Sequence, residues 1–86
     1  MEFKLSRHAR EEMERRGISQ SMLESVLENP QQVIDEVRGK KIYQSQVDIG
    51  GGKIYLLRAV VFEEADPPLV ITVYRTSKIA KYWRTA

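Results

Sequence analysis

The sequence predicts an α+β fold, in which an N-terminal helical hairpin packs on a four-stranded, mainly antiparallel sheet and a short C-terminal helix or tail follows. Three observations predict this fold. Apolar residues recur at helical spacing early in the chain, they alternate or run continuously later, and glycine or proline separates these segments. The length of 86 residues is that of a single domain, residues 1–86.

The first predicted helix begins after Ser6, whose side chain is a good helix cap, and continues through Arg16. Gly17 follows at the position where helices often end in a left-handed conformation. The apolar stripe of this helix, at i, i+4 and i+8, consists of Leu5, Ala9 and Met13. We therefore expect one face of the helix to pack on the sheet.

A second helix is predicted to begin after Ser19 and to end at Asn29-Pro30, because the residue before a proline avoids the helical conformation. The buried face of this helix consists of Met22, Leu23, Val26 and Leu27. The two helices are joined by a link short enough for a helical hairpin, and we expect Ile18 in this link to be a hydrophobic plug.

Four strands follow, because the apolar period changes from helical spacing to alternation after Pro30. The strands are expected over residues 32–37, 41–49, 54–62 and 69–76. The third strand is apolar at almost every position, which is typical of an inner strand covered on both faces. The strands are separated by a turn at 38–40, a glycine loop at 50–52 and an Asp-Pro-Pro break at 66–68, and residues 77–83 form a short helix or an ordered tail.

The composition excludes several classes of protein. Cysteine is absent, so neither a disulfide nor a zinc-thiolate site can form. No apolar run approaches the ~18–20 residues of a membrane span, and the charged N-terminal residues are unlike a secretory signal. We expect a cytoplasmic protein without membrane contact, and no motif in the sequence requires a metal or another cofactor.

The net charge of +2 hides an uneven distribution of charge. Residues 24–36 contain four acidic residues and no basic one, whereas residues 69–86 contain four basic residues and no acidic one. The basic segment also contains two tyrosines and the single tryptophan, a combination typical of contact with phosphates and nucleobases. Lys78 and Lys81 are therefore candidate substrate-binding residues, although the segment also fits an ordinary solvated chain end.

His8 is the single histidine, and a histidine side chain can both accept and donate a proton near neutral pH. On the first helix His8 lies beside Ala9, at the edge of the apolar stripe. Glu11 and Glu12 follow at i+3 and i+4, where either carboxylate can orient the imidazole. The sequence leaves two roles open, a catalytic base or acid and a boundary histidine whose ring covers the sheet.

Arg58 interrupts the apolar strand over residues 54–62. A guanidinium group in an inner strand must be paired, or must open onto a cleft that binds an anion. The first alternative is an ion pair with Asp35, Glu36 or Asp48 across the sheet. The second is a phosphate-binding arginine on an open face of the sheet.

The last predicted strand provides a third group of candidates. Thr72 and Tyr74 share one side of this strand, and Arg75 lies on the other side. Tyr74 can donate a hydrogen bond or transfer a proton, and Arg75 can bind a phosphate through two parallel hydrogen bonds. The alternative is a strand of ordinary β-forming residues that ends in a solvated arginine.

The stretch 6–19, Ser-Arg-His-Ala-Arg-Glu-Glu-Met-Glu-Arg-Arg-Gly-Ile-Ser, resembles the opening signature of a bacterial family named domain of unknown function 4258. The strand 70–75, Val-Ile-Thr-Val-Tyr-Arg, is similar to the closing signature of that family, and the Asn-Pro helix end is similar too. The resemblance spans residues 4–82. Glu12 departs from the pattern, because many relatives have arginine before the methionine.

This resemblance implies a layout similar to RelE/ParE-type toxins, which are small metal-independent ribonucleases. RNA would then be the substrate, and a small antitoxin protein would be a partner. The catalytic candidates that the resemblance implies are His8, Arg58, Tyr74 and Arg75, with Thr72 as a supporting hydroxyl, and all of them would surround one cleft.

The competing hypothesis is a non-catalytic protein–protein interaction module. That module could be a homodimer in which the acidic segment of one chain pairs with the basic segment of another.

Overall fold

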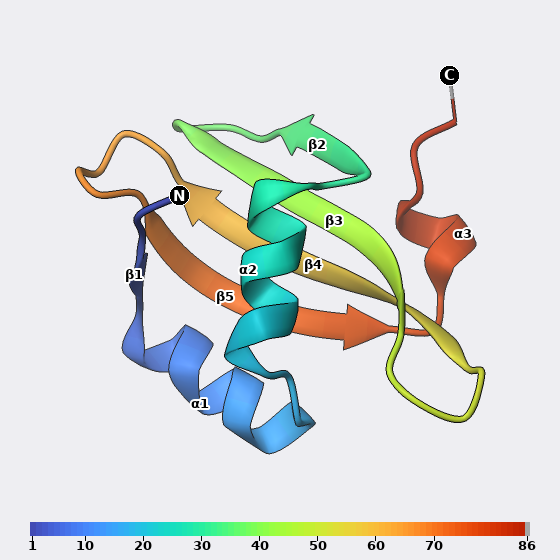
Figure 1. Cartoon of the computed structure of the whole chain (residues 1–86). Helices are drawn as coiled ribbons and strands as arrows, with labels where there is room; N and C mark the ends of the chain where they lie inside the picture. Colours follow the sequence, from blue (N-terminus) through green and yellow to red (C-terminus); the bar gives the residue numbers. More distant parts are fainter. Residues whose placement is uncertain (86) are drawn as a thin grey trace.

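A computed structural model describes residues 1–85, which form a mixed α+β fold (Figure 1). In these residues a five-stranded sheet has the order β1-β5-β4-β3-β2 and is accompanied by three helices. The elements are β1 (Lys4–Leu5), α1 (Arg7–Arg16), α2 (Gln20–Glu28), β2 (Gln32–Asp35), β3 (Lys40–Asp48), β4 (Ile54–Phe62), β5 (Leu69–Thr76) and α3 (Ile79–Tyr82). No helix within residues 1–85 is both long enough and apolar enough to cross a membrane.

The sheet has one strand more than the sequence predicts. β1 lies at the edge of the sheet and runs parallel to β5, with Lys4 opposite Leu69 and Leu5 opposite Val70. The two residues of β1 are too few to show the alternation of a strand, and their partner strand β5 lies near the other end of the chain. No local sequence pattern therefore predicts this pairing. The other pairs are antiparallel as expected, and the helices follow a strand rather than opening the chain.

Both predicted helices are confirmed together with their caps. The Ser6 hydroxyl accepts a hydrogen bond from the Ala9 amide at 2.9 Å and also donates to the Ile71 carbonyl at 2.6 Å, which ties α1 to β5. Gly17 ends α1 with a φ angle of 66°, a conformation that costs glycine little. The Ser19 hydroxyl caps α2 by accepting from the Met22 amide at 3.2 Å.

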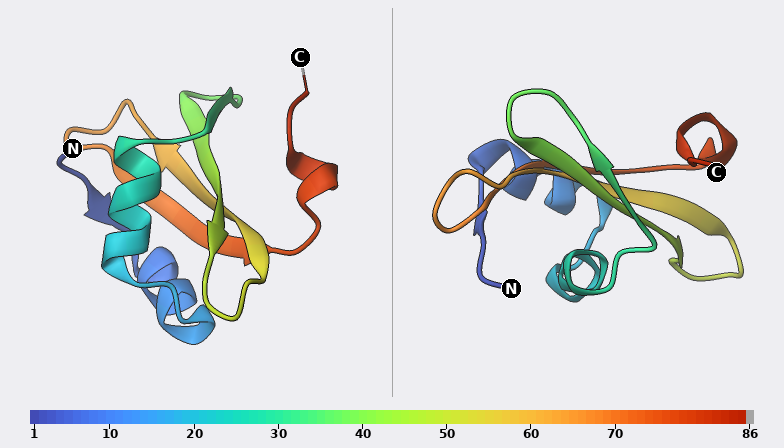
Figure 2. Two further views of the ribbon diagram at one scale, coloured as in Figure 1. Left: turned by 45° about the vertical axis from the view of Figure 1, so that its right-hand side comes forward. Right: turned by 90° about the horizontal axis from the view of Figure 1, so that it is seen from above.

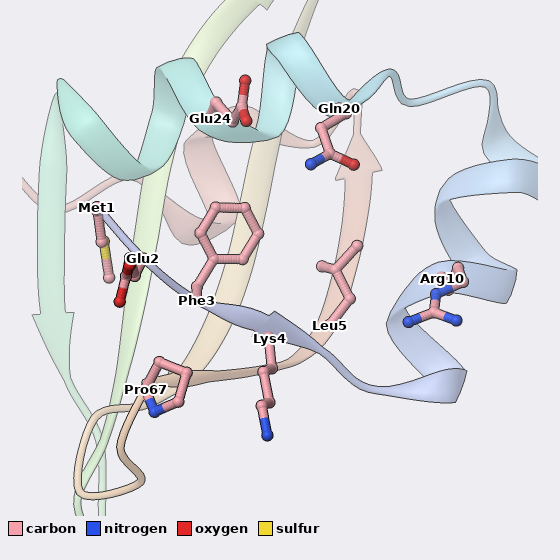
Figure 3. A pocket seen from close by; sticks show the side chains of 9 residues that line it. All are labelled: Met1, Glu2, Phe3, Lys4, Leu5, Arg10, Gln20, Glu24 and Pro67. Atoms are coloured by element: carbon pink, nitrogen blue, oxygen red, sulfur yellow. The ribbon is translucent and has the colours of Figure 1, made fainter.

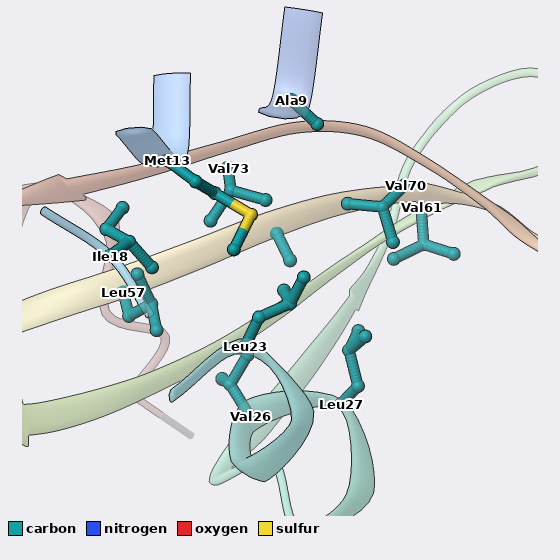
Figure 4. Packing of buried hydrophobic residues seen from close by; sticks show 11 residues of the cluster. Ala9, Met13, Ile18, Leu23, Val26, Leu27, Leu57, Val61, Val70 and Val73 are labelled. Carbon is teal, nitrogen blue, oxygen red and sulfur yellow. The ribbon is translucent and has the colours of Figure 1, made fainter. Parts of the chain in front are cut away.

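The hydrophobic core lies between the sheet and the first two helices (Figure 4). We call this side of the sheet the helix face. Ile18 is buried in this core, as the plug interpretation predicts. The buried residues of the cluster are Ala9, Met13, Ile18, Leu23, Val26, Leu27, Leu57, Ala59, Val61, Val70 and Val73.

A β-bulge in β5 decides which side chains reach each face of the sheet. The pairing moves from Val60–Thr72 to Val61–Val70, so Ile71 is an extra residue. Strict alternation would place Val70 on the same side as Thr72, but the bulge returns Val70 to the core, where it is fully buried. Thr72 and Tyr74 therefore lie on the opposite face, on which α3 also lies (Figure 2, right). We call this side the α3 face.

The remaining boundaries differ from the prediction by a few residues. β2 ends at Asp35, two residues earlier than expected, and Arg38 and Gly39 form the turn with φ angles of 62° and 74°. The predicted C-terminal helix or tail contains a helix of only four residues, α3, none of which is buried. This short helix nevertheless covers the polar part of the α3 face.

Candidate functional site beneath helix α3

A row of polar side chains crosses the α3 face of the sheet. The row follows the strand register, in which Gln32 of β2 lies opposite Gln44 of β3, Gln44 opposite Arg58 of β4, and Arg58 opposite Tyr74 of β5. Side chains directly opposite each other on one face of a sheet are close enough to interact. Four strands thus bring one cation, two amides and one phenol together.

Arg58 is the centre of this row and is only 7% exposed. Its Nε atom donates a hydrogen bond to Gln44 Oε1 at 2.8 Å, and its Nη1 atom donates to the Tyr74 hydroxyl. The guanidinium carbon lies 4.3 Å from the ring centroid of Tyr82 and 5.7 Å from that of Tyr74. Three side chains, those of Gln44, Tyr74 and Tyr82, therefore surround the guanidinium group.

Two glutamines attach α3 and the following residues to the sheet. Gln44 is fully buried, and its Nε2 atom donates to Gln32 Oε1 at 2.7 Å and to the Tyr82 carbonyl at 3.2 Å. Gln32 binds the backbone of Arg84 twice, because its Oε1 accepts at 3.1 Å and its Nε2 donates at 2.6 Å. The cover over Arg58 is held by these amides and by the Tyr82 ring.

Arg58 has no acidic partner in the described part of the chain, because no carboxylate of residues 1–85 lies within 4.0 Å of it. The expected ion pair is therefore absent there, and two of its proposed partners are engaged elsewhere. Asp35 lies 3.9 Å from Lys41 Nζ, and Asp48 accepts from the Gly50 amide at 2.9 Å. A buried charge without a counter-charge costs on the order of several kcal/mol.

One nitrogen of Arg58 still reaches the surface. Within residues 1–85, Nη2 forms no hydrogen bond, whereas Nε and Nη1 each form one. No buried polar side-chain atom of that part of the chain lacks a hydrogen-bond partner, so residues 1–85 do not fully enclose Nη2. The guanidinium group therefore has one free donor at the edge of its enclosure.

Two other titratable groups of the described residues have close hydrogen-bonding partners. Arg15 and Arg16 both bind the Glu12 carboxylate, and these hydrogen bonds lower the pKa of Glu12 below its usual value. The Tyr43 hydroxyl donates to Glu63, and burial together with this hydrogen bond raises the pKa of Tyr43 to about 12. Arg58 differs from these groups because it is buried against neutral atoms only.

The structure brings some of the predicted site residues together. Thr72 is half-buried on the α3 face, two residues from Tyr74 on the same strand. Lys78 and Lys81 are exposed at the start and the end of α3, and Lys81 Nζ lies 5.3 Å from the Tyr82 ring centroid. The α3 face therefore joins Arg58, Tyr74 and Thr72, and the two lysines belong to the segment that forms α3.

The structure does not bring His8 or Arg75 to this group. His8 lies on α1, which packs along β5 and β1, and its side chain is 61% exposed, with Nε2 3.9 Å from Glu12 Oε1. Arg75 points to the helix face, where its guanidinium carbon lies 4.8 Å from the Tyr55 ring centroid. The single cleft that the sequence predicts around His8, Arg58 and Arg75 is thus not formed by the described residues.

The sequence interpretation missed Gln32 and Gln44 as members of the site. One signal was present, because Gln44 shares a side of its strand with the apolar Ile42. A glutamine at an inward position of an inner strand needs partners for its amide, and the nearest candidates are polar residues on neighbouring strands. Tyr82 carried no comparable signal, because four-residue helices leave no period in a sequence.

A surface cavity of about 740 Å³ lies elsewhere, between β1 and α2 (Figure 3). It contains none of the predicted site residues, and its lining includes the apolar side chains of Phe3 and Leu5 and the charged side chains of Arg10 and Glu24. Residues 1–85 contain no group of three or more His, Asp or Glu side chains that could share a metal ion.

The fold and the buried row define a small α+β domain with a covered cationic site on the sheet. The chain belongs to the family described as Domain of unknown function (DUF4258), whose model matches residues 5–75. No curated protein and no solved structure matches the chain. The likeness in layout to RelE/ParE-type toxins stays a prediction from the sequence.

Proposed function

We propose that this protein is an RNA-binding domain in which Arg58 holds a phosphate group and Tyr74 adds a second hydrogen bond. The observation that carries the proposal is a buried guanidinium group with aromatic and amide neighbours and no carboxylate within 4.0 Å in residues 1–85. A phosphate would supply the missing negative charge and would accept from Nη2. RNA is favoured among phosphate ligands because the adjoining segment, residues 69–86, is rich in basic and aromatic residues.

Access to the whole guanidinium group of Arg58, rather than to Nη2 alone, requires movement of α3. The Tyr82 ring lies over the guanidinium group, and the backbone of α3 and the next residues is held by Gln44 and Gln32. Because α3 has four residues and none is buried, little apolar surface opposes its movement. A phosphate that accepts from Nη2 would then have more room beside the guanidinium group.

The charge around the cover also favours this function. Lys78 and Lys81 are exposed, and Arg84 follows within the same stretch, which has no acidic residue. Such a cluster attracts a polyanion from solution and holds its phosphates in a salt-dependent way.

Metal-independent cleavage of RNA is a second candidate, favoured by one observation on Tyr74. The Tyr74 hydroxyl accepts a hydrogen bond from Arg58, which leaves its own proton free to be donated. In cleavage, the ribose 2′-oxygen would form a bond to phosphorus, the bond from phosphorus to the 5′-oxygen would break, and Tyr74 would protonate that oxygen. A base must remove the 2′-proton, and His8 lies on α1, apart from Arg58. Binding is therefore the better supported function.

The test is the affinity for a fluorescein-labelled RNA oligonucleotide, measured by anisotropy. Arg58→Met removes the cation and keeps an unbranched side chain, and we expect its affinity to fall at least tenfold. Arg7→Met is the matched control, because the Arg7 side chain is 93% exposed and its loss changes the net charge equally. We expect less than a twofold change for this control. Equal affinities of the wild type and Arg58→Met would overturn the proposal.

Cleavage is tested with the same RNA in the presence of EDTA. The second candidate predicts that the wild type cuts RNA and that Tyr74→Phe cuts at least tenfold more slowly. His8→Ala shows whether the histidine contributes from its place on α1. Binding without cutting would leave the binding function alone. No binding at all would favour the interaction-module hypothesis, whose homodimer form sedimentation at low and high salt would reveal.

A further inference from the structure

Two cations share one aromatic ring on the helix face, at the end of the sheet that carries the β3–β4 hairpin. The guanidinium carbon of Arg75 lies 4.8 Å from the ring centroid of Tyr55, and Lys53 Nζ lies 5.2 Å from the same centroid. Arg75 comes from β5, Tyr55 from β4, and Lys53 from the residue before β4. These three residues form what we call the Tyr55 cluster.

The strand register explains why the Tyr55 cluster forms. Arg75 lies opposite Leu57, and Tyr55 lies two residues from Leu57 on the same strand, so both share the helix face. Leu57 is buried at the margin of the core, whereas Tyr55 and Arg75 are half-buried beyond it. Figures 1 and 2 show the β3–β4 hairpin extending past α1 and α2, so neither of these helices covers this end of the helix face.

Neither cation of the cluster has an acidic partner in residues 1–85. Lys41, by contrast, lies 3.4 Å from Glu63, and Arg7 lies 3.5 Å from Glu11. Two positive groups held near one ring repel each other, and a bound anion would turn this repulsion into attraction. The ring supplies a flat apolar surface next to that anion position.

We propose that the Tyr55 cluster is a second RNA contact that selects single strands, with one base stacked on Tyr55 and the flanking phosphates held by Arg75 and Lys53. The inference rests on the proposed RNA-binding function and adds the class of RNA. Stacking of this kind needs an unpaired base, since the bases of a duplex are stacked on one another and turned inward. The base takes the place of Lys53 over the ring, and the flexible lysine moves to a phosphate.

One strand of RNA can reach both contacts. Tyr74 and Arg75 are neighbours in β5 and point to opposite faces of the sheet, Tyr74 beside Arg58 and Arg75 beside Tyr55. β5 ends at Thr76, directly after them. A single strand that passes over this end of the sheet therefore meets Arg58 on one face and the Tyr55 cluster on the other.

The experiment compares a labelled single-stranded oligouridine with an RNA duplex of the same length. We expect Tyr55→Leu to weaken binding of the single strand about tenfold and to leave duplex binding unchanged. Tyr55→Phe keeps the ring and is the matched control, with an expected change below twofold. Lys53→Gln lies at an exposed position, so it leaves the fold intact, and we expect the salt dependence (the slope of log K against log salt) to fall by about 0.7.

The outcomes separate this inference from the proposed function. If the wild type binds neither RNA, both the function and the inference fail. If Arg58→Met weakens binding while Tyr55→Leu and Lys53→Gln do not, the function stands and the Tyr55 cluster has no role in it. Equal effects of Tyr55→Leu on single strand and duplex would also overturn the selection of single strands. Urea unfolding of each variant confirms that folded proteins are compared.

Discussion

The two faces of the sheet are both buried, but they are buried in different ways. The helix face packs the apolar side chains of β4 and β5 on α1 and α2, and Leu23 of α2 is fully buried in this core. The α3 face buries Gln44 and Arg58 beneath a helix of only four residues. The helix face is buried by apolar packing. The α3 face encloses a positive charge between neutral polar groups and aromatic rings.

This difference indicates that the helix face stabilises the fold, whereas the α3 face is the better candidate for a functional site. Apolar burial contributes roughly 25 cal/mol per Å² and is the main favourable term in folding. A buried cation without a counter-charge opposes folding, so stability alone does not explain the presence of Arg58. A buried side chain that lowers stability is a candidate for binding or catalysis.

The largest effect is expected from Leu23→Ala on the helix face. This change removes a fully buried side chain from the core and leaves a cavity, which costs about 2–5 kcal/mol. Urea unfolding followed by circular dichroism measures this loss. Val33→Ala, at a side chain that is 46% exposed, is the control and should change stability by less than about 0.5 kcal/mol. Similar losses for both variants would contradict the assignment of the core.

A smaller effect is expected from Gln44→Leu on the α3 face. Leucine has a similar volume, but the change removes the acceptor for Arg58 Nε and the donors to Gln32 and the Tyr82 carbonyl. Leaving these polar groups without partners should cost about 1–3 kcal/mol. Fluorescence of Trp83, next to α3, should also change because the cover loses one attachment. An unaltered spectrum would show that Gln44 does not hold α3.

The third effect is confined to alkaline pH and concerns Tyr43 on the helix face. Its pKa is raised to about 12 in the folded protein, against about 10 in the unfolded chain. Tyr43 therefore contributes stability that is complete below pH 10 and is lost as the pH rises through about 12. When the ionisation of the four tyrosines is followed by absorbance, Tyr43 should be the last to ionise as the pH rises. This last step should be missing in Tyr43→Phe. A last step that persists in this variant would refute the assignment.

The smallest effect is expected from Glu12→Gln on α1. Hydrogen bonds from Arg15 and Arg16 lower the pKa of Glu12, so its contribution is present above the pKa of an unfolded glutamate, about 4.5. The contribution is lost as the pH falls through the lowered value. The stabilities of the wild type and Glu12→Gln should therefore differ slightly at pH 7 and converge in acid. A difference that grows in acid would have the wrong sign.

Much of the helix face could be predicted from the sequence, because local signals define it. Serine caps and glycine or proline stops bound α1 and α2, and an apolar period identifies the buried side of each helix. β1 and the bulge at Ile71 could not be predicted in the same way. Both depend on pairing between distant segments, and neither leaves a repeating pattern.

The candidate site was predicted only in part. The anomaly of a charged residue in an apolar strand identified Arg58, and strand alternation correctly put Thr72 and Tyr74 on one side. Which acid, amide or ring lies against Arg58 depends on the register of four strands and on where α3 lies, and no local pattern contains that information. The grouping of His8 with Arg58 failed for the same reason, because nothing in the sequence shows how α1 sits relative to β4.

The most direct test of the central claim measures stability and RNA affinity on one variant, Arg58→Met. Removing the cation relieves the burial of an uncompensated charge and leaves Gln44 Oε1 without a donor, so these effects oppose each other. We predict that the free energy of unfolding changes by less than about 1 kcal/mol while RNA affinity falls at least tenfold. A loss of about 3 kcal/mol or more with unchanged RNA affinity would show that Arg58 serves the fold, which contradicts the account.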